Sequence, residues 1–260
     1  MITIIHNNEG PGDSAVPSTP SLEERGADAE ALRTAWGFAA VVDISEGRVL
    51  FDVGVDGEVL LHNARALGID LSDVGAIVLS HADTDHTGGL SEALSECAPG
   101  CTVYTPGTFP SSITDKVKAA GGKLVETESP TEICEGVAST GPVPGWKVEQ
   151  GLVITAPLAG ADFGPVLVTG CAHPGIAKMA RSAALVAGES PKTVLGGFHM
   201  GELQDEQIRA VADELREIGV VNVGPTHCTG ESAREFFRSE WSGSFVDADL
   251  GAVIDMAGQV

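Results

Sequence analysis

Side chains that commonly bind metal ions crowd one short stretch of the sequence: His81, Asp83, Asp85 and His86. They follow the apolar run at residues 76–79 and precede two glycines, a pattern typical of a buried strand that ends in a loop before a helix. Imidazole and carboxylate groups at these spacings can converge on one or two metal ions. Alternatively, Asp83 or Asp85 caps the helix, but a cap explains only one carboxylate. We therefore predict a metal site at this strand end.

Later histidines repeat the same local pattern. His173, His199 and His227 each follow an apolar run, so five of the seven histidines lie at predicted strand ends, and only His6 and His62 fall outside. One histidine after a strand is more often structural than functional, but the repetition favours a shared site, because the ends of parallel strands meet at one edge of a sheet.

The stretch from His81 to His86, read as His-Ala-Asp-Thr-Asp-His, resembles the His-X-His-X-Asp-His signature of the metallo-beta-lactamase superfamily. It departs from that signature at Asp83, which stands in place of the second histidine. Residues 169–176, 196–199 and 225–230 are similar to the subgroup named for dihydropterin-(ribofuranosyl)aminobenzene-phosphate synthases. The resemblance spans most of the chain and implies a four-layer alpha-beta-beta-alpha sandwich.

The resemblance also implies a ligand set. His173 and His227 would complete the metal shell begun by His81, Asp83, Asp85 and His86, and His199 would either contact substrate or supply a further ligand. The bridging carboxylate of many superfamily members is not evident. Cys171 follows the strand in its place, as either a soft ligand or a packed thiol.

The expected cofactor is one or two divalent metal ions. Zinc is one option, and manganese or iron is the other, because the carboxylate of Asp83 is a harder, more anionic ligand than imidazole. Such ions lower the pKa of a bound water and polarise a phosphoryl or carbonyl oxygen, which is the chemistry of hydrolysis. We predict catalytic roles for Asp85, which would orient the nucleophile while ligating metal, and for His199, which would protonate the leaving group or bind a phosphate oxygen.

The glycines near the predicted site, at residues 88–89, 170 and 196–197, would let backbone N–H groups approach an anionic substrate. Asp52 has two open interpretations: it holds a metal-bound histidine in position, or it caps a turn.

Three classes of function follow from these residues. The leading hypothesis is a metal-dependent hydrolase of a small, anionic phosphorylated or ester substrate. The alternatives are a pterin-related synthase that forms a carbon–carbon or carbon–nitrogen bond, and a non-hydrolytic iron or redox protein. A pterin ring would stack on aromatic side chains, which are few here: 3 Trp, 1 Tyr and 8 Phe, with Trp36, Trp146 and Phe198 the best placed.

The hydrophobic pattern predicts a single α/β domain over residues 1–260. We expect a long loop at residues 10–31, a candidate lid, and a change after residue 130 to short strands that form a second sheet. The predicted strands are an edge strand at 2–5 and further strands at 37–44, 48–51, 76–79, 101–104, 123–125, 137–140 and 152–155. The predicted helices span 57–67, 88–97 and 111–120.

The composition restricts partners and location. Acidic residues outnumber basic ones 37 to 15, and the net charge of −22 argues against nucleic acid or an anionic membrane as a partner. The acidic surface is explained either by solubility or by a high-salt habitat. Five irregularly spaced cysteines and an N-terminus without a signal pattern favour a reduced, cytoplasmic protein. Nothing in the sequence predicts the oligomeric state.

Overall fold

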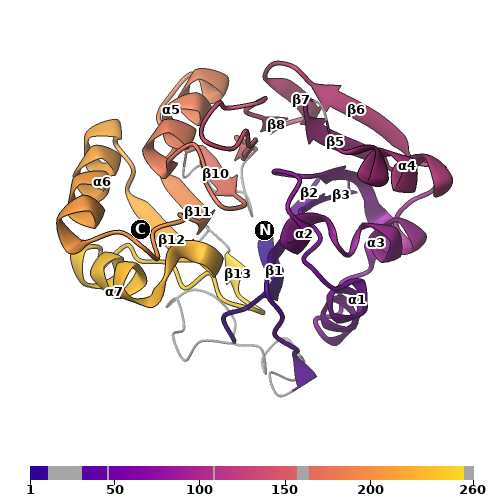
Figure 1. Cartoon of the computed structure of the whole chain (residues 1–260), viewed down its shortest axis with the longest axis horizontal. Helices are drawn as coiled ribbons and strands as arrows, with labels where there is room; N and C mark the ends of the chain where they lie inside the picture. Colours follow the sequence, from indigo (N-terminus) through magenta and orange to yellow (C-terminus); the bar gives the residue numbers. More distant parts are fainter. Residues whose placement is uncertain (11–30, 46, 108, 157–163, 255–260) are drawn as a thin grey trace.

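The computed structural model describes residues 1–10, 31–45, 47–107, 109–156 and 164–254. Residues 11–30, which make up most of the predicted loop and candidate lid, lie outside this part of the chain. The described strands form two sheets, and the described helices cover their outer faces (Figure 1). None of these helices is long and apolar enough to cross a membrane.

The first sheet has seven strands in the order β13-β1-β2-β3-β4-β5-β6. Strands β3 to β6 run parallel, because helices α1, α3 and α4 return the chain between them. The strands are β1 (Ile2–Asn7), β2 (Phe38–Ile44), β3 (Gly47–Phe51), β4 (Val74–Val78), β5 (Thr102–Pro106), β6 (Lys123–Thr127) and β13 (Val253–Ile254). The helices are α1 (Gly57–Ala66), α3 (Leu90–Glu96) and α4 (Ser111–Ala119).

The prediction that residues 2–5 form an edge strand is wrong. β1 pairs with β2 on one side and with β13 on the other, where Ile2 lies opposite Ile254, and all six residues of β1 are buried. The two-residue β13 is too short to show a hydrophobic pattern, so its pairing with the start of the chain could not be read from the sequence.

The second sheet has six strands in the order β12-β11-β10-β9-β8-β7, and it begins after residue 130 as predicted. Strands β10, β11 and β12 run parallel, joined by α5 and α6. The strands are β7 (Thr131–Cys134), β8 (Val137–Ser139), β9 (Leu152–Ile154), β10 (Val166–Thr169), β11 (Thr193–Gly197) and β12 (Asn222–Thr226). The helices are α5 (Ile176–Ala187), α6 (Asp205–Ile218) and α7 (Glu231–Glu240).

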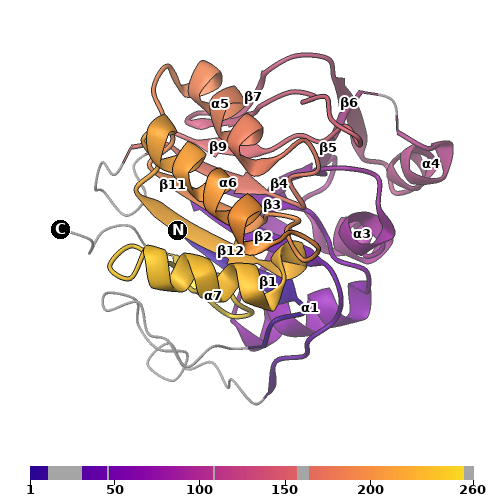
Figure 2. The same cartoon turned by 60° about the vertical axis from the view of Figure 1, so that its left-hand side comes forward.

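The predicted four-layer α/β sandwich is confirmed. Along β2, Phe38, Ala40 and Val42 pack between the sheets, whereas Ala39 and Val41 pack against the helices outside the first sheet, as the two-residue period of a strand requires. A third apolar cluster lies between the second sheet and α5, α6 and α7, which lie side by side in Figure 2.

The predicted helix at 88–97 is in fact preceded by a separate short helix, α2 (Thr84–Thr87), and α3 begins only at Leu90. Gly88 and Gly89 lie between the two helices, where a Cβ atom on either would collide with the carbonyl oxygen of Val55 or Val53. These glycines are therefore needed for close packing of backbone against backbone.

The other glycines near the site behave in the same way. A Cβ at Gly170 would meet the side chain of Ser80, and one at Gly196 or Gly197 would meet the backbone of β10 or the residue after it. The backbone N–H groups of Gly88, Gly89, Gly170 and Gly197 already donate to protein oxygens, so the predicted approach of an anionic substrate to these four N–H groups has no support.

Candidate metal centre

The carboxyl ends of β4, β10, β11 and β12 meet at one edge of the sandwich and bring the predicted histidines together. His81 follows β4, His86 lies on α2, and His173, His199 and His227 follow the other three strands. Their rings form a chain: the centroids of His81 and His86 lie 4.2 Å apart, those of His81 and His173 4.5 Å, those of His86 and His227 5.0 Å, and those of His173 and His199 4.7 Å.

The ligand atoms gather into groups that share the sulfur of Cys171. One group is Asp85, His86, Cys171 and His227, a second is His81, Cys171 and His173, and a third is Cys171, His199 and Cys228; within each, the atoms lie within 4.8 Å of one another. Cys171 Sγ is 3.3 Å from His86 Nε2. The sulfur of Cys171 is thus common to all three groups.

Four of these histidines are held by an oxygen at Nδ1. The contacts are His86 to Asp52 Oδ2 at 2.7 Å, His173 to Glu149 Oε2 at 3.0 Å, His227 to Asn8 Oδ1 at 2.7 Å, and His81 to Ser80 Oγ at 2.9 Å. Because Ser80 donates its own hydroxyl proton to Asp52, its oxygen is free to accept from His81. A histidine that donates from Nδ1 presents an unprotonated Nε2, which is the arrangement that orients ligands around metals.

The donor atoms fit a metal. The Nε2 atoms of His81 and His227 are buried, and neither has a hydrogen-bond partner among the described residues. A buried nitrogen left without a partner is costly, so its presence twice in one cluster indicates a missing ligand. Nitrogen, carboxylate and sulfur donors around these atoms suit one or two divalent ions of the zinc, iron or manganese type.

Asp83 lies at the margin of the cluster. It precedes α2, but its side chain makes no capping hydrogen bond, so the capping alternative has no support. Its Oδ2 is 3.4 Å from His81 Nε2 and is paired with Lys147. The contact with His81, together with the pairing with Lys147, outweighs burial and holds the pKa of Asp83 well below its usual range. The carboxylate is ionised and shared between the cluster and a lysine.

The pKa values of the cluster's titratable groups are shifted in both directions. Burial alone would lower the pKa of His86, but the charge and hydrogen bond of Asp52 outweigh it and raise that pKa to about 9. Burial lowers the pKa of His81. For Asp85, burial acts to raise the pKa, yet the contact with His227 and the charges of His86 and His227 bring it well below the usual range. Without metal, the site therefore combines a carboxylate with both charged and neutral imidazoles.

Sequence reasoning missed two residues that position the ligands. Glu149 is fully buried, and its oxygens accept hydrogen bonds from the backbone N–H groups of residues 170, 171, 172 and 173. Burial raises its pKa, but the bond with His173, the charge of His81 and these N–H groups lower it to about 2. Asn8 holds His227 across 219 residues of sequence. Neither residue lies in a motif, and no local pattern distinguishes either one. Asp52 contacts His86, as one of its two interpretations proposed.

Backbone strain concentrates at the same place. Among the described residues, the non-glycine residues with positive φ are Asp52, Ala172, His199 and His227, at 56°, 57°, 50° and 54°. All lie in the cluster or beside it. Left-handed backbone at bulky residues persists only where surrounding contacts enforce it, and it is enriched at functional sites.

Two exposed tryptophans flank the histidines. Trp36 donates from Nε1 to Asp85 Oδ2 at 3.0 Å, and its ring lies 5.2 Å from that of His227. Trp146 lies 4.6 Å from His173 and 5.6 Å from His199, ring centroid to ring centroid. Phe198, the third predicted aromatic residue, is buried and packs edge-on against Phe237. Two of the three aromatic residues thus lie beside the candidate metal ligands.

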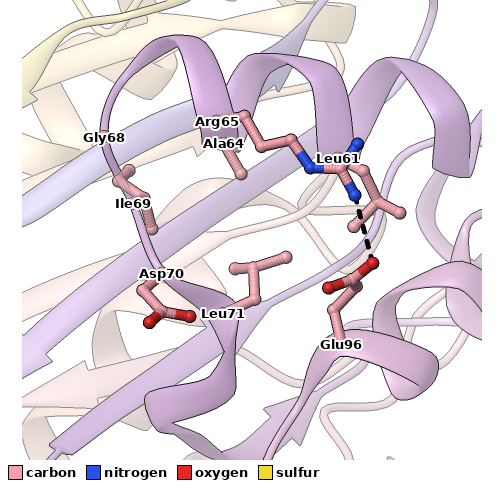
Figure 3. Close-up of a pocket in the computed structure, with 8 residues that line it drawn as sticks. All are labelled: Leu61, Ala64, Arg65, Gly68, Ile69, Asp70, Leu71 and Glu96. Carbon is pink, nitrogen blue, oxygen red and sulfur yellow. Dashed lines mark hydrogen bonds and ion pairs between the residues drawn. The ribbon is translucent and has the colours of Figure 1, made fainter.

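One pocket lined by described residues lies away from this chemistry. It has a volume of about 320 Å³ beside α1 and α3, and Arg65 and Glu96 form an ion pair at its side (Figure 3). Its lining contains none of the clustered ligands. The second pocket, of about 240 Å³, is lined in part by His173 and His199. We therefore associate the smaller pocket with the site.

Comparison with known proteins agrees with the fold and the ligand pattern. A model of the metallo-beta-lactamase superfamily matches residues 37–100, which include β4, α2 and the first cluster residues. The chain is thus similar to the metallo-beta-lactamase superfamily over these residues.

The chain is also similar to individual proteins over most of its length. The chain is 25% identical over 246 residues to the 7,8-dihydropterin-6-methyl-4-(beta-D-ribofuranosyl)-aminobenzene-5'-phosphate synthase of Methanocaldococcus jannaschii, an alignment that covers 80% of this chain and 84% of the relative. It is also similar, at 27% identity and a TM-score of 0.69 with 98% of both chains covered, to a crystal structure described as Tm1679, a metal-dependent hydrolase of the beta-lactamase superfamily. Human tRNase Z, short form, shares only the fold, at 14% identity and a TM-score of 0.59 with 98% of both chains covered.

Proposed function

We propose that the protein is a metal-dependent hydrolase of a small phosphorylated or ester substrate. The observation that carries this proposal is the gathering of ligand atoms into two groups around Cys171, one with Asp85, His86 and His227 and the other with His81 and His173. Bound divalent ions would be held by these residues, with Asp83 beside the second group, and would supply a water of lowered pKa and polarise the substrate oxygen. The similarity to a metal-dependent hydrolase over 98% of both chains supports the same class.

Asp85 and His199 are the proposed catalytic residues. The Asp85 carboxylate lies 3.5 Å from His86 Nε2 and 3.4 Å from His227 Nε2, and Trp36 donates a hydrogen bond to it, so it is held where it would ligate metal and orient an attacking water. His199 is exposed at the mouth of the smaller pocket, where it would donate a proton to the leaving group or contact a phosphate oxygen.

The test combines metal content with turnover. Protein loaded separately with zinc, manganese or iron would be assayed for bound metal by mass spectrometry and for cleavage of a panel of phosphate and carboxylate esters. We expect at least one metal form to cleave an ester, and His227→Ala to lose both the metal and the cleavage. A protein that binds metal stoichiometrically and cleaves none of the panel contradicts hydrolysis.

A pterin-related synthase is the second candidate, and the named synthase of Methanocaldococcus jannaschii is the observation that favours it. Such an enzyme would join a pterin-bearing carbon to a second substrate with loss of a leaving group. Exposed Trp36 and Trp146 beside the ligands suit a flat ring of this kind. A pterin absorbance titration separates the candidates, because a hydrolase of unrelated esters would leave the pterin spectrum unchanged.

A further inference from the structure

The pocket of about 240 Å³ begins at the candidate metal ligands and continues away from them over the start of α5. We propose that this pocket binds a planar aromatic ring of the substrate against the indole of Trp146. The residues that define it are Trp146, His173, Ile176, Phe198, His199 and Met200. The proposal rests on the proposed function, because it assumes that the reacting group of the substrate lies at the histidine end of the pocket.

The lining is apolar where a ring would lie. Ile176, Phe198 and Met200 are each at most 2% exposed, so they provide a fixed apolar floor. Trp146 differs, because 70% of its surface is exposed although it contacts the rings of His173 and His199. An indole left open to water beside buried ligands contributes little to the fold, and it is well suited to cover an incoming apolar group.

The loop that carries Trp146 is fixed in place. Val143 and Glu149 exchange two backbone hydrogen bonds, of 2.8 and 3.2 Å, across its base. A Cβ at Gly145 would lie 2.5 Å from the Cα of Pro174, so the loop packs against the segment that follows His173. Glu149, at the end of the loop, also holds His173. The backbone of Glu149 therefore closes the loop that carries the indole, while its carboxylate holds His173, and a site ordered in advance costs less to order on binding.

The size and the charge of the pocket define the ligand class. Pockets that enclose drug-sized molecules have roughly 300–1,000 Å³, so this one suits one ring portion of a larger substrate. Lys178 and Glu214, which have opposite charges, line the pocket, so the lining has no excess charge where the ring would lie. Divalent ions at the histidine end would instead attract an anionic reacting group. An aliphatic chain would gain only buried area here, whereas an aromatic ring would also stack on the indole. A flat ring attached to an anionic reacting group is therefore the favoured occupant.

The test measures binding without turnover. 1-Naphthylmethylphosphonate and butylphosphonate have a carbon in place of the ester oxygen, so a hydrolase cannot cleave them, and calorimetry on the manganese-loaded protein would give their affinities. We expect the naphthyl compound to bind more tightly, Trp146→Ala to weaken it roughly tenfold, and Trp146→Phe to restore most of the affinity. Butylphosphonate affinity should change less than threefold in the same variants.

Leu185→Ala is the matched control, because Leu185 lies on α5 with 87% exposure and outside the pocket, and it should leave both affinities unchanged. No preference of the wild type for the naphthyl ring, no naphthyl binding, or equal losses of both ligands in Trp146→Ala would overturn the pocket assignment. Failure of the proposed hydrolase would look different: no ester would be cleaved, while the dependence of naphthyl binding on Trp146 would persist.

Discussion

Glu149→Gln tests whether a buried carboxylate builds the second ligand group. Oε1 of Glu149 accepts hydrogen bonds from the N–H groups of Gly170, Cys171 and Ala172 at 2.9–3.1 Å, while Oε2 accepts from the backbone N–H of His173 and contacts its Nδ1, both at 3.0 Å. A glutamine oxygen can retain the first three bonds. Its NH₂ group then faces the backbone N–H and the Nδ1 of His173. Because an amide nitrogen cannot accept a hydrogen bond, both bonds to His173 are lost.

The magnitude follows from the bonds that are lost. A hydrogen bond to a charged group contributes about 1.5–3 kcal/mol, and a buried donor without an acceptor costs roughly 1–3 kcal/mol. We expect Glu149→Gln to lower the free energy of unfolding of the metal-free protein by about 3 kcal/mol. Because His173 also loses the acceptor that orients its ring, metal affinity should fall roughly 10–100-fold.

Urea unfolding of the metal-free protein and metal titration would measure the two effects. Glu126→Gln makes the same chemical change at an exposed position on β6 and should alter neither quantity. If Glu149→Gln unfolds within about 0.5 kcal/mol of the wild type and binds metal equally well, Glu149 does not organise this part of the site.

Four further predictions concern the site and the whole chain. His81→Ala or His227→Ala should abolish metal-dependent activity while circular dichroism shows a folded protein, because both residues follow strands rather than form the sheet core; normal turnover would disprove their assignment. Asp83→His should shift the preference from manganese or iron towards zinc, and identical metal rankings in side-by-side titrations would mean that Asp83 is no ligand. The net charge of −22 should make the melting temperature rise between low and molar salt, and an unchanged value would contradict self-repulsion as a destabilising force. Burial lowers the pKa of His6 to about 4, below the roughly 6.5 of an unfolded chain, so the folded state should lose about 3 kcal/mol of stability as the pH falls from 6.5 to 4. Urea unfolding at the two pH values should show a smaller loss for His6→Gln. An unaltered pH dependence in that variant would show that His6 is not responsible.

Local hydrophobic patterns predicted most of the fold. The apolar run of β4 and the strands near residues 137 and 152 were recognisable because their side chains are buried between layers. Pairing across the whole chain was not recognisable. β13 joins β1 through two residues, and such a contact leaves no periodic signal in either segment.

The residues of the site also differ in whether local sequence could predict them. Histidines that follow strands were predictable, since parallel strands deliver their ends to one edge. The residues that hold them were not, because Asn8 reaches His227 and Glu149 reaches His173 only through the tertiary fold. The shared position of Cys171 likewise depends on how the two sheets meet, which the sequence left open between a ligand and a packed thiol.

The departure from the family signature at Asp83 is balanced by Lys147. The carboxylate adds negative charge to a cluster that already contains Asp52, Asp85 and Glu149, and the lysine ammonium pairs with it directly. The side chains of this pair are 33% and 38% exposed, so the pair itself is worth about 0–1 kcal/mol, and Lys147 can turn to water when Asp83 is replaced. As the proposed ligand, Asp83 would instead contact the ion directly, so its replacement would change the donor atom that the ion meets. The metal preference of Asp83→His should therefore follow the chemistry of the new imidazole rather than the loss of the lysine partner.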